Sequence, residues 1–271
     1  MLVDTNSKYE QLSGLKYVYQ KIEDFFSEVG EVALFSGRFF RTFWQPPYEW
    51  RELLNQSYFI GNKSIFLVSL TGFIMGLVLD LQSRPTMIEF GAVSWMPSMV
   101  GITIVREMGP MITALICAGK VGSSIGAELG SMRVTEQIAA MEVSGTNPYK
   151  YLVVTRVVAT TLMLPLLVIL GDAFALGGSF LVENLKGNVS FHLYFNQVFD
   201  SLAMGDIVPS TIKTFFFGAA IGLVGCYKGY TSSKGTAGVG KASNSAVVVA
   251  SVVVFVLDFM AVLIADLFYE L

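Results

Sequence analysis

Apolar residues gather into five long stretches along this chain. Their approximate limits are Tyr58–Leu81, Ala92–Ala118, Leu152–Val182, Ile207–Tyr227 and Ala246–Phe268. Each is near the roughly 20 residues of helix that cross the hydrocarbon core of a bilayer. Because a membrane offers no partner for exposed backbone polar groups, the pattern predicts five transmembrane helices in an all-α polytopic protein.

A different pattern precedes the first stretch. Apolar positions there alternate three and four residues apart, which predicts an amphipathic helix. They are Leu15, Val18, Ile22, Phe25, Val29 and Val32. Aromatic and arginine side chains follow and favour the lipid headgroup zone. They are Arg38, Phe39, Phe40, Arg41, Phe43 and Trp44. We therefore expect an interfacial helix in residues 1–50, closed by Pro46-Pro47, and a membrane domain in residues 51–271; a soluble dimerisation helix is the alternative.

Residues 106–148 begin inside the second stretch and continue toward the third as a more polar segment with helical spacing. Small residues recur every four positions along it, at Ala118, Gly122, Gly126 and Gly130. Glycine in a helix interior costs about 1 kcal/mol relative to alanine, so this ridge indicates close approach by another helix. Ser144-Gly145, with Pro148 behind, predicts the end of the helix.

Two interpretations of this polar helix remain open. It is either a solvated loop helix, with Arg133 and Glu136 as a weak i, i+3 pair, or a helix that docks into a cytoplasmic partner and transmits its motion to the spans. Charged and apolar side chains interleave along it, as a docking surface requires.

Composition supports the membrane class and excludes others. Of 271 residues, 53% are hydrophobic and only 14% charged, with a mean hydropathy of +0.59, outside the range of soluble proteins. The net charge of −3 argues against a nucleic-acid partner. Cys117 and Cys226 lie in apolar stretches and His192 stands alone, so no disulfide or metal site is expected.

Loop charges predict the orientation. The N-terminus lacks the features of a signal peptide, so we place it in the cytoplasm. Basic residues then concentrate on the cytoplasmic side, as the positive-inside rule requires. They are Lys8 to Arg51, Lys120, Arg133, Lys150, Lys228, Lys234 and Lys241, whereas the outer connectors hold chiefly Arg84 and Lys186. The C-terminus is expected outside.

Ionisable residues within the predicted spans are candidate sites, because burial there costs several kcal/mol unless the group is paired or faces water, and four are singled out. They are Arg106, Glu107, Asp172 and Asp258. They form either an ion pathway or structural pairs that fix helix packing. Gly109-Pro110 is expected to break the helix and to free carbonyls for Arg106. The connector from Glu183 to Asp206 shows no recognisable chemistry.

The segment Gly235–Lys241, GTAGVGK, satisfies the G-x-x-x-x-G-K pattern of a phosphate-binding loop. Its context argues against nucleotide binding, because a membrane span precedes it in place of a strand, and Ala242 stands where the magnesium ligand belongs. We expect the glycines to shape a tight cytoplasmic loop. No nucleophile and base are paired elsewhere, so an enzyme active site is not expected.

Three segments carry a family resemblance. They read REMGPMITALICAGKVGSSIGAELGSMRVTEQIAAMEVSGTNP (106–148), GFIMGLVLDLQ (72–82) and GYTSSKGTAGVGKA (229–242). They resemble the MlaE (YrbE) family, the permease subunits of lipid-trafficking ABC transporters in Gram-negative bacteria and plastids. The resemblance covers about four fifths of the chain.

The resemblance implies partners that the residues alone do not reveal. It implies a homodimer in the inner membrane, with a periplasmic C-terminus, a cytoplasmic ATPase that binds ATP and Mg²⁺, and an MCE-domain protein on the outer side. A STAS-domain regulator accompanies some members. No cofactor is expected on this chain. The cytoplasmic coupling helix between spans 2 and 3 would contact the ATPase through Glu128, Met132, Arg133 and Glu136.

The implied function is ATP-driven movement of phospholipid, or a similar lipid, between inner and outer membranes. If the first two spans lie near the dimer axis, a lipid cavity would be lined by Phe73, Leu77, Val100 and Met108. The alternatives are an ion-coupled secondary transporter that uses Asp172 or Asp258, and a membrane scaffold without transport. The sequence fixes neither the transport direction nor the headgroup preference.

Overall fold

The computed structural model describes residues 30–46 and 48–269, and all regular structure within them is helical. The chain divides into two compact units, with the boundary between residues 46 and 47. In the first unit, residues 30–43 are helical and the helix ends before Pro46. The predicted apolar stripe from Leu15 to Val29 lies outside the described residues, and its interfacial role stays a prediction.

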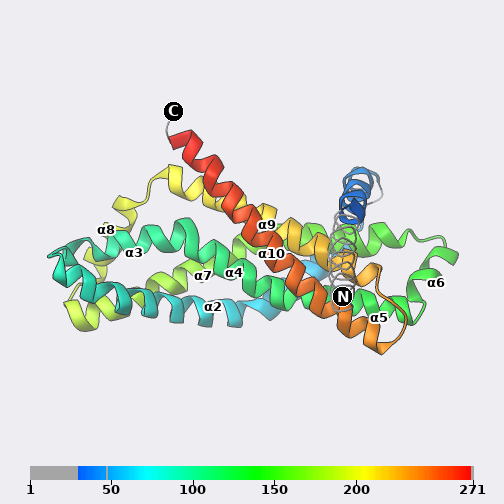
Figure 1. Ribbon diagram of the computed structural model, residues 1–271, viewed down its shortest axis with the longest axis horizontal. Helices are drawn as coiled ribbons and strands as arrows, with labels where there is room; N and C mark the ends of the chain where they lie inside the picture. The colour runs from blue at the N-terminus through cyan, green and yellow to red at the C-terminus, as the bar shows by residue number, and fades with distance from the viewer. Residues whose placement is uncertain (1–29, 47, 270–271) are drawn as a thin grey trace, which may run out of the picture. The chain divides into compact units, whose positions relative to one another are not determined.

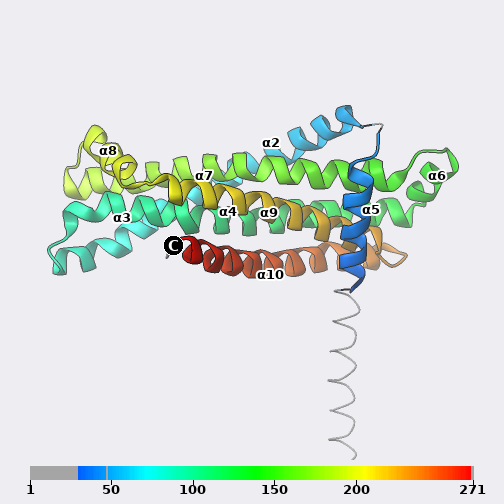
Figure 2. The same ribbon diagram turned by 90° about the horizontal axis from the view of Figure 1, so that it is seen from above.

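The second unit is a bundle of long helices. It contains α2 (Trp50–Glu89), α3 (Met96–Thr103), α4 (Gly109–Cys117), α5 (Ser123–Val134), α6 (Gln137–Val143), α7 (Thr155–Gly187), α8 (Phe191–Ser201), α9 (Met204–Tyr230) and α10 (Thr236–Tyr269). A 3₁₀ turn, η1 (Val93–Trp95), and three π-helical turns, η2 (Ile104–Met108), η3 (Ala118–Gly122) and η4 (Tyr149–Val154), connect them. Helices α5 and α6 lie at one end of this bundle, and α8 lies at the opposite end beside the turn from α2 to α3 (Figures 1 and 2).

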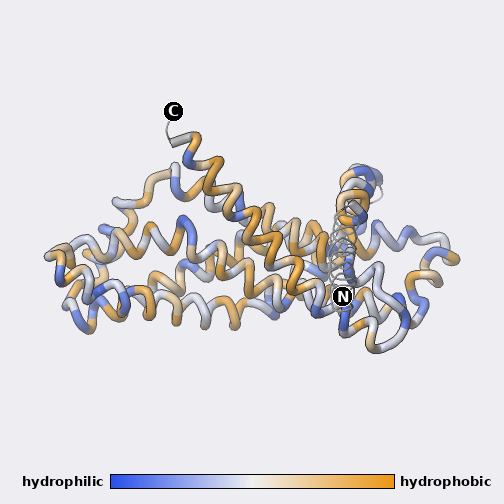
Figure 3. The backbone as a smooth tube through the Cα atoms, in the orientation of Figure 1, coloured by the Kyte–Doolittle hydropathy of each residue, from blue (hydrophilic) through white to orange (hydrophobic). Residues whose placement is uncertain are grey.

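Among the residues that the structure describes, five segments are long and apolar enough to cross a membrane, as predicted. They are Trp50–Glu89, Val93–Val134, Tyr149–Gly187, Met204–Tyr230 and Thr236–Leu267. Their hydrophobic character is plainest along α10, which is orange over most of its length in Figure 3. The helices exceed the predicted spans: α2 has 40 residues and is about 60 Å long, twice the thickness of the hydrocarbon core. The bundle therefore extends beyond the bilayer.

The second span is continuous, so the prediction of a break at Gly109-Pro110 is wrong. A π turn at η2 leads directly into α4, where Pro110 occupies the first turn. Proline lacks a backbone N–H and cannot donate the i to i−4 bond of an α-helix, and the preceding π turn changes the hydrogen-bond pattern at that point. The π turn and the position of Pro110 together let the chain pass without a break.

The polar helix after the second span is broken, where a single element was expected. Helix α5 ends at Val134, and Glu136 adopts a left-handed conformation with φ of 57° before α6 begins. The Thr135 hydroxyl donates to the Ser131 carbonyl at 2.9 Å and closes the last turn of α5. The predicted terminus at Ser144-Gly145 is confirmed, since α6 ends at Val143 and Gly145 has a φ of 78°.

Glycines set the closest helix contacts. A Cβ on Gly72 of α2 would lie 2.5 Å from the Gly171 carbonyl oxygen of α7, and one on Gly178 would overlap the Phe73 carbonyl. The ridge on η3 and α5 behaves as predicted: a Cβ on Gly126 would lie 3.2 to 3.3 Å from α10 atoms of Ala242, Ser243 and Ala246. This ridge packs within the chain and is not free for a partner.

The end of the bundle beside α8 is held by a buried core and a polar network. The core cluster comprises Met96, Val100, Ile104, Ala175, Leu176, Tyr194 and Val198. Tyr194 donates to the Ser179 hydroxyl at 2.8 Å, and Ser179 donates to Asp80 at 2.6 Å. Burial raises the pKa of Tyr194 far above its ordinary value, so it remains a neutral donor.

Candidate functional site

A buried lysine joins three spans. Lys213 of α9 has a side chain only 6% exposed, and its Nζ donates to Glu107 Oε2 at 2.7 Å and to Asp258 Oδ1 at 2.9 Å. Glu107 comes from the second span and Asp258 from α10. The paired interpretation of these two carboxylates is thus the one that the geometry favours, because a lysine this deep requires a counter-ion.

Lys213 was missed by sequence reasoning. It stands alone in the apolar run of α9, and the four in-span residues predicted above do not include it. A signal did exist: Asp258 has no cation in its predicted span, Ala246–Phe268, so a lone lysine in another span could have supplied one. Such a pairing between distant spans is decided by the packing of the helices.

A second ionic layer surrounds Arg106. Its guanidinium lies 3.7 Å from Asp206 at the start of α9 and 3.8 Å from Asp266 near the end of α10. The Arg106 side chain is 36% exposed, so solvent weakens these pairs. The expectation that Arg106 binds backbone carbonyls stays a prediction. The connector from Glu183 to Asp206 also proves to hold counter-ions, since Glu183 pairs with Arg84.

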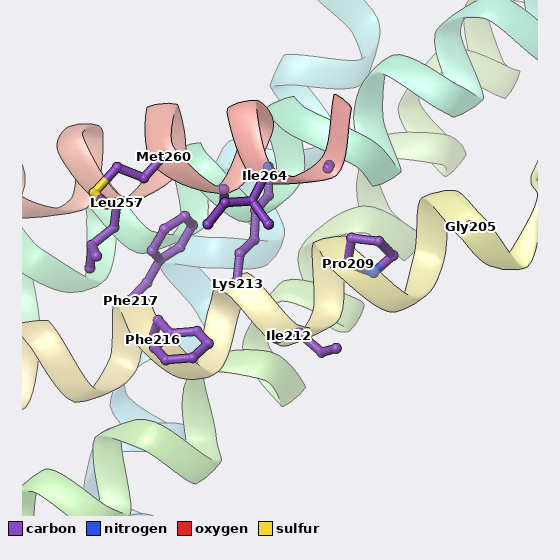
Figure 4. Close-up of a pocket in the computed structure, with 11 residues that line it drawn as sticks. Gly205, Pro209, Ile212, Lys213, Phe216, Phe217, Leu257, Met260 and Ile264 are labelled. Atoms are coloured by element: carbon purple, nitrogen blue, oxygen red, sulfur yellow. The ribbon is translucent and has the colours of Figure 1, made fainter. Parts of the chain in front are cut away.

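An apolar groove of about 540 Å³ opens between α9 and α10 beside Lys213. Residues of the two helices face each other across it (Figure 4), among them Pro209, Phe216 and Phe217 of α9 and Met260 and Ile264 of α10. This volume lies within the 300 to 1,000 Å³ that is usual for ligand sites in proteins. Because Lys213 is already paired with two carboxylates, the groove offers an apolar wall in which that lysine needs no further counter-ion.

Asp172, the remaining predicted in-span residue, is not part of the Lys213 cluster. It is half-buried in α7, and its Oδ1 atom has no hydrogen-bond partner. A Cβ on Gly109 would overlap that carboxyl group, so α4 can pass Asp172 only with glycine there. The carboxyl therefore sits directly against the backbone of the second span.

The residues predicted to line a lipid cavity occupy different surroundings. Phe73 lines an open groove of about 930 Å³ between α2 and α7, Leu77 is half-buried and Met108 is 36% exposed beside Glu107. Val100 is 3% exposed and packs within the core cluster, so it does not line an open cavity in this structure. A common cavity for these residues stays a prediction.

The residues predicted to contact an ATPase lie on and after α5. Met132 is half-buried, and Arg133 and Glu136 are exposed. Glu128 Oε1 accepts a hydrogen bond at 2.8 Å from Arg156, whose side chain is 1% exposed. Sequence reasoning did not identify Arg156, because the cation lies at the start of α7 and meets α5 only in the folded bundle. Glu128 thus already has a partner within the chain.

The phosphate-binding-loop look-alike is mostly helical. Gly235 has a φ of 97°, but α10 begins at Thr236, so the rest of the motif lies in its first turns. The glycines therefore shape a tight loop only at Gly235. Within the described residues, no group of three His, Cys, Asp or Glu side chains could hold a metal ion.

The sequence is similar to one family profile and to several known proteins. Residues 53–264 match the sequence profile of the family described as Permease MlaE. A "Probable ABC transporter permease protein" of Rickettsia typhi is 38% identical over 236 residues, which cover 87% of this chain and 91% of the relative. One from Synechocystis is 32% identical over 209 residues, covering 77% and 80%. The Arabidopsis thaliana protein named TRIGALACTOSYLDIACYLGLYCEROL 1, chloroplastic, is 33% identical over 211 residues, covering 78% and 60%.

Proposed function

The chain belongs to the MlaE permease family, and on this premise we propose that it carries phospholipid, or a similar lipid, between the inner and outer membranes. It is a multi-pass ABC transporter permease, and the family lacks an ATPase domain. A separate ATPase subunit therefore supplies the energy, and ATP and Mg²⁺ belong to that partner.

The observation that carries the lipid proposal is the apolar groove between α9 and α10. Each methylene of an acyl chain gains about 0.8 kcal/mol on leaving water, and flexible Met, Leu and Phe side chains adapt to different chains. The groove contains such residues on both walls. The name of the Arabidopsis relative also refers to a lipid. Phe73, Leu77 and Met108 are retained as further contacts for lipid in a dimer.

The end of the bundle that carries α5 and α6 is proposed to face the ATPase. Helix α6 is short and exposed, with Val143 90% exposed at its end. Together with Met132, Arg133 and Glu136 it forms the proposed coupling surface; Glu128 would act there through its bond to Arg156. The remaining proposals are a homodimer in the inner membrane, a cytoplasmic N-terminus, a periplasmic C-terminus, and an MCE-domain protein at the end that carries α8. A STAS-domain subunit on the ATPase would be a further partner.

Asp172 supports a second candidate, an ion-coupled secondary transporter. Its Oδ1 atom has no partner, whereas Glu107 and Asp258 are both bonded to Lys213. A single unpartnered carboxyl is weak support for ion coupling, because a relay across the membrane needs several groups in sequence.

Reconstitution separates the two functions. The chain is purified from its native membrane, the co-purifying ATPase is identified, and transfer of labelled phospholipid is measured in proteoliposomes. We expect transfer to require ATP and to stop when the Walker lysine of the ATPase is replaced, while an ionophore that removes the proton gradient has no effect. Transfer that needs no ATPase but stops with the ionophore would instead establish the carrier.

A further inference from the structure

A small pocket, separate from the α9–α10 groove, lies between α2 and the segment from η3 to α5, and its lining mixes charged and polar side chains with apolar ones. Residues of α2 and of the segment from η3 to α5 line it. Its volume is about 30 Å³, and a cavity needs about 10 to 15 Å³ to hold one water molecule. The pocket can therefore admit the oxygen atoms of a headgroup but not an acyl chain.

Two lysines from different elements meet at this pocket. Lys120, on the π turn η3, reaches across and donates to the backbone carbonyl of Lys63 on α2. The ammonium of Lys63 lies 3.6 Å from the centroid of the Phe59 ring. Neither lysine forms an ion pair with a residue that the structure describes. Both ammonium groups therefore keep donors for an anion.

A buried hydroxyl adds a donor to the same pocket. Ser64 is 1% exposed and lines the pocket, yet its Oγ has no hydrogen-bond partner. A buried polar atom without a partner costs about 1 to 3 kcal/mol in a folded protein. An anionic oxygen in the pocket would accept from this hydroxyl and remove that cost.

The charges around the pocket favour an anion. Glu128 lies on its wall but is bonded to Arg156, and Glu52 accepts from Gln56 at 2.7 Å. Of the residues that line the pocket, Lys63 and Lys120 are cations and Glu128 is the one carboxylate, which leaves one positive charge in excess. That excess lies on the two lysines, because Glu128 neutralises Arg156.

The face of α2 that carries Lys63 continues as an apolar track. Phe59, Lys63, Phe66, Leu70 and Phe73 follow one another four and three residues apart, so they share one helix face. The last three line the open groove of about 930 Å³ against Phe174 and Gly177 of α7. Phe66 is 75% exposed. Lys63 and Phe73 are separated by about 15 Å along the helix, which is the hydrocarbon depth of one leaflet.

From this arrangement we propose that α2 holds a phospholipid of the adjacent leaflet, with its phosphate between Lys63, Lys120 and the Ser64 hydroxyl and an acyl chain along Phe66, Leu70 and Phe73. The charged pocket and the apolar groove match the two ends of one amphipathic ligand. The site does not depend on which lipid the transporter carries or in which direction.

The test uses the full chain with its ATPase in nanodiscs that contain radiolabelled phosphatidylglycerol. A photoreactive phenylalanine analogue replaces Phe66, and crosslinked lipid is counted. We expect strong crosslinking that falls about tenfold in the double variant Lys63→Gln, Lys120→Gln, since each lysine near a membrane contributes measurably to anionic-lipid binding. The matched variant Lys234→Gln, Lys241→Gln removes the same charge from exposed positions elsewhere and should crosslink as the wild type does.

Further arms identify the ligand. Lys63→Arg, Lys120→Arg should restore most of the crosslinking, which shows that the glutamine pair has not simply misfolded the chain. Labelled diacylglycerol, which lacks the phosphate, should crosslink weakly. Equal crosslinking in both glutamine pairs, displacement of the lipid by millimolar inorganic phosphate, or capture of a second copy of the chain at Phe66 would each overturn the site. None of these readouts requires transport, so failure of the proposed function would be seen separately.

Discussion

At the scale of single residues, the least expected feature is Lys213. A lysine in the middle of a membrane helix is costly unless its charge is compensated, and here Glu107 and Asp258 compensate it from two other spans. The cluster carries one positive and two negative charges, so it is not neutral. Of the two ion pairs of Lys213, the one with Asp258 is the stronger, because Glu107 is 36% exposed and partly screened by solvent.

Replacement of Lys213 by methionine should destabilise the bundle by about 3 kcal/mol, because removal of one partner leaves buried carboxylates without a cation. The measurement is thermal unfolding of the purified chain in detergent. Lys213→Met with Asp258→Asn should recover part of the loss, as expected for two residues in direct contact. A Lys213→Met variant as stable as the wild type would show that the ion cluster contributes nothing to folding.

At the scale of helices, the contact between α2 and α7 depends on side chains that are absent. Gly72 and Gly178 let the two backbones approach to a separation that a Cβ would prevent. In a membrane, such close approach provides much of the packing energy between helices, because lipid tails are as apolar as the side chains. The two neighbouring glycines of α7 differ in this respect: a Cβ on Gly177 would meet nothing within 4 Å.

Gly178→Ala should therefore destabilise the chain by about 1 to 3 kcal/mol through overpacking, whereas Gly177→Ala should be neutral or slightly stabilising, because alanine favours the helix by about 1 kcal/mol. Thermal unfolding and the yield of folded protein in detergent compare the two. Similar losses in both variants would mean that the α2–α7 distance is not limited by Gly178.

At the scale of the whole membrane unit, its two ends carry different surfaces. The α5–α6 end exposes Val143, and the opposite end exposes Phe90 at the turn after α2. Both side chains are largely free of contacts, with 90% and 77% exposure, so substitution of either should change stability little. The two positions can therefore be compared directly.

Val143→Asp should abolish co-purification of the ATPase, whereas Phe90→Asp should leave it intact, because only the α6 end is proposed to face the cytoplasm. The readout is the ratio of ATPase to permease after affinity purification in detergent, with size-exclusion profiles as the check on folding. Retention of the ATPase by Val143→Asp, with loss in Phe90→Asp, would reverse the proposed orientation.

The sequence by itself determined the number of spans, the helical class and the polar helix after the second span. These features follow from local patterns: apolar length, helical periodicity and terminal signals such as Ser144-Gly145 are properties of neighbouring residues. The small-residue ridge from Ala118 to Gly130 was also predictable, because small residues at every fourth position of a helix let another helix approach closely.

Only the tertiary structure decided which charges meet. Lys213 pairs with Glu107 and Asp258, Arg156 pairs with Glu128, and Arg84 pairs with Glu183. The partners are separated by 28 to 106 positions in the sequence. Such pairs depend on which helices are neighbours and on their rotation, and no local pattern encodes either. The π turn before Pro110 and the break at Glu136 were not predicted for a related reason. Each is a small change of backbone geometry stabilised by the packing around it. The pockets beside Lys213 and Lys63 likewise exist only because those helices lie where they do.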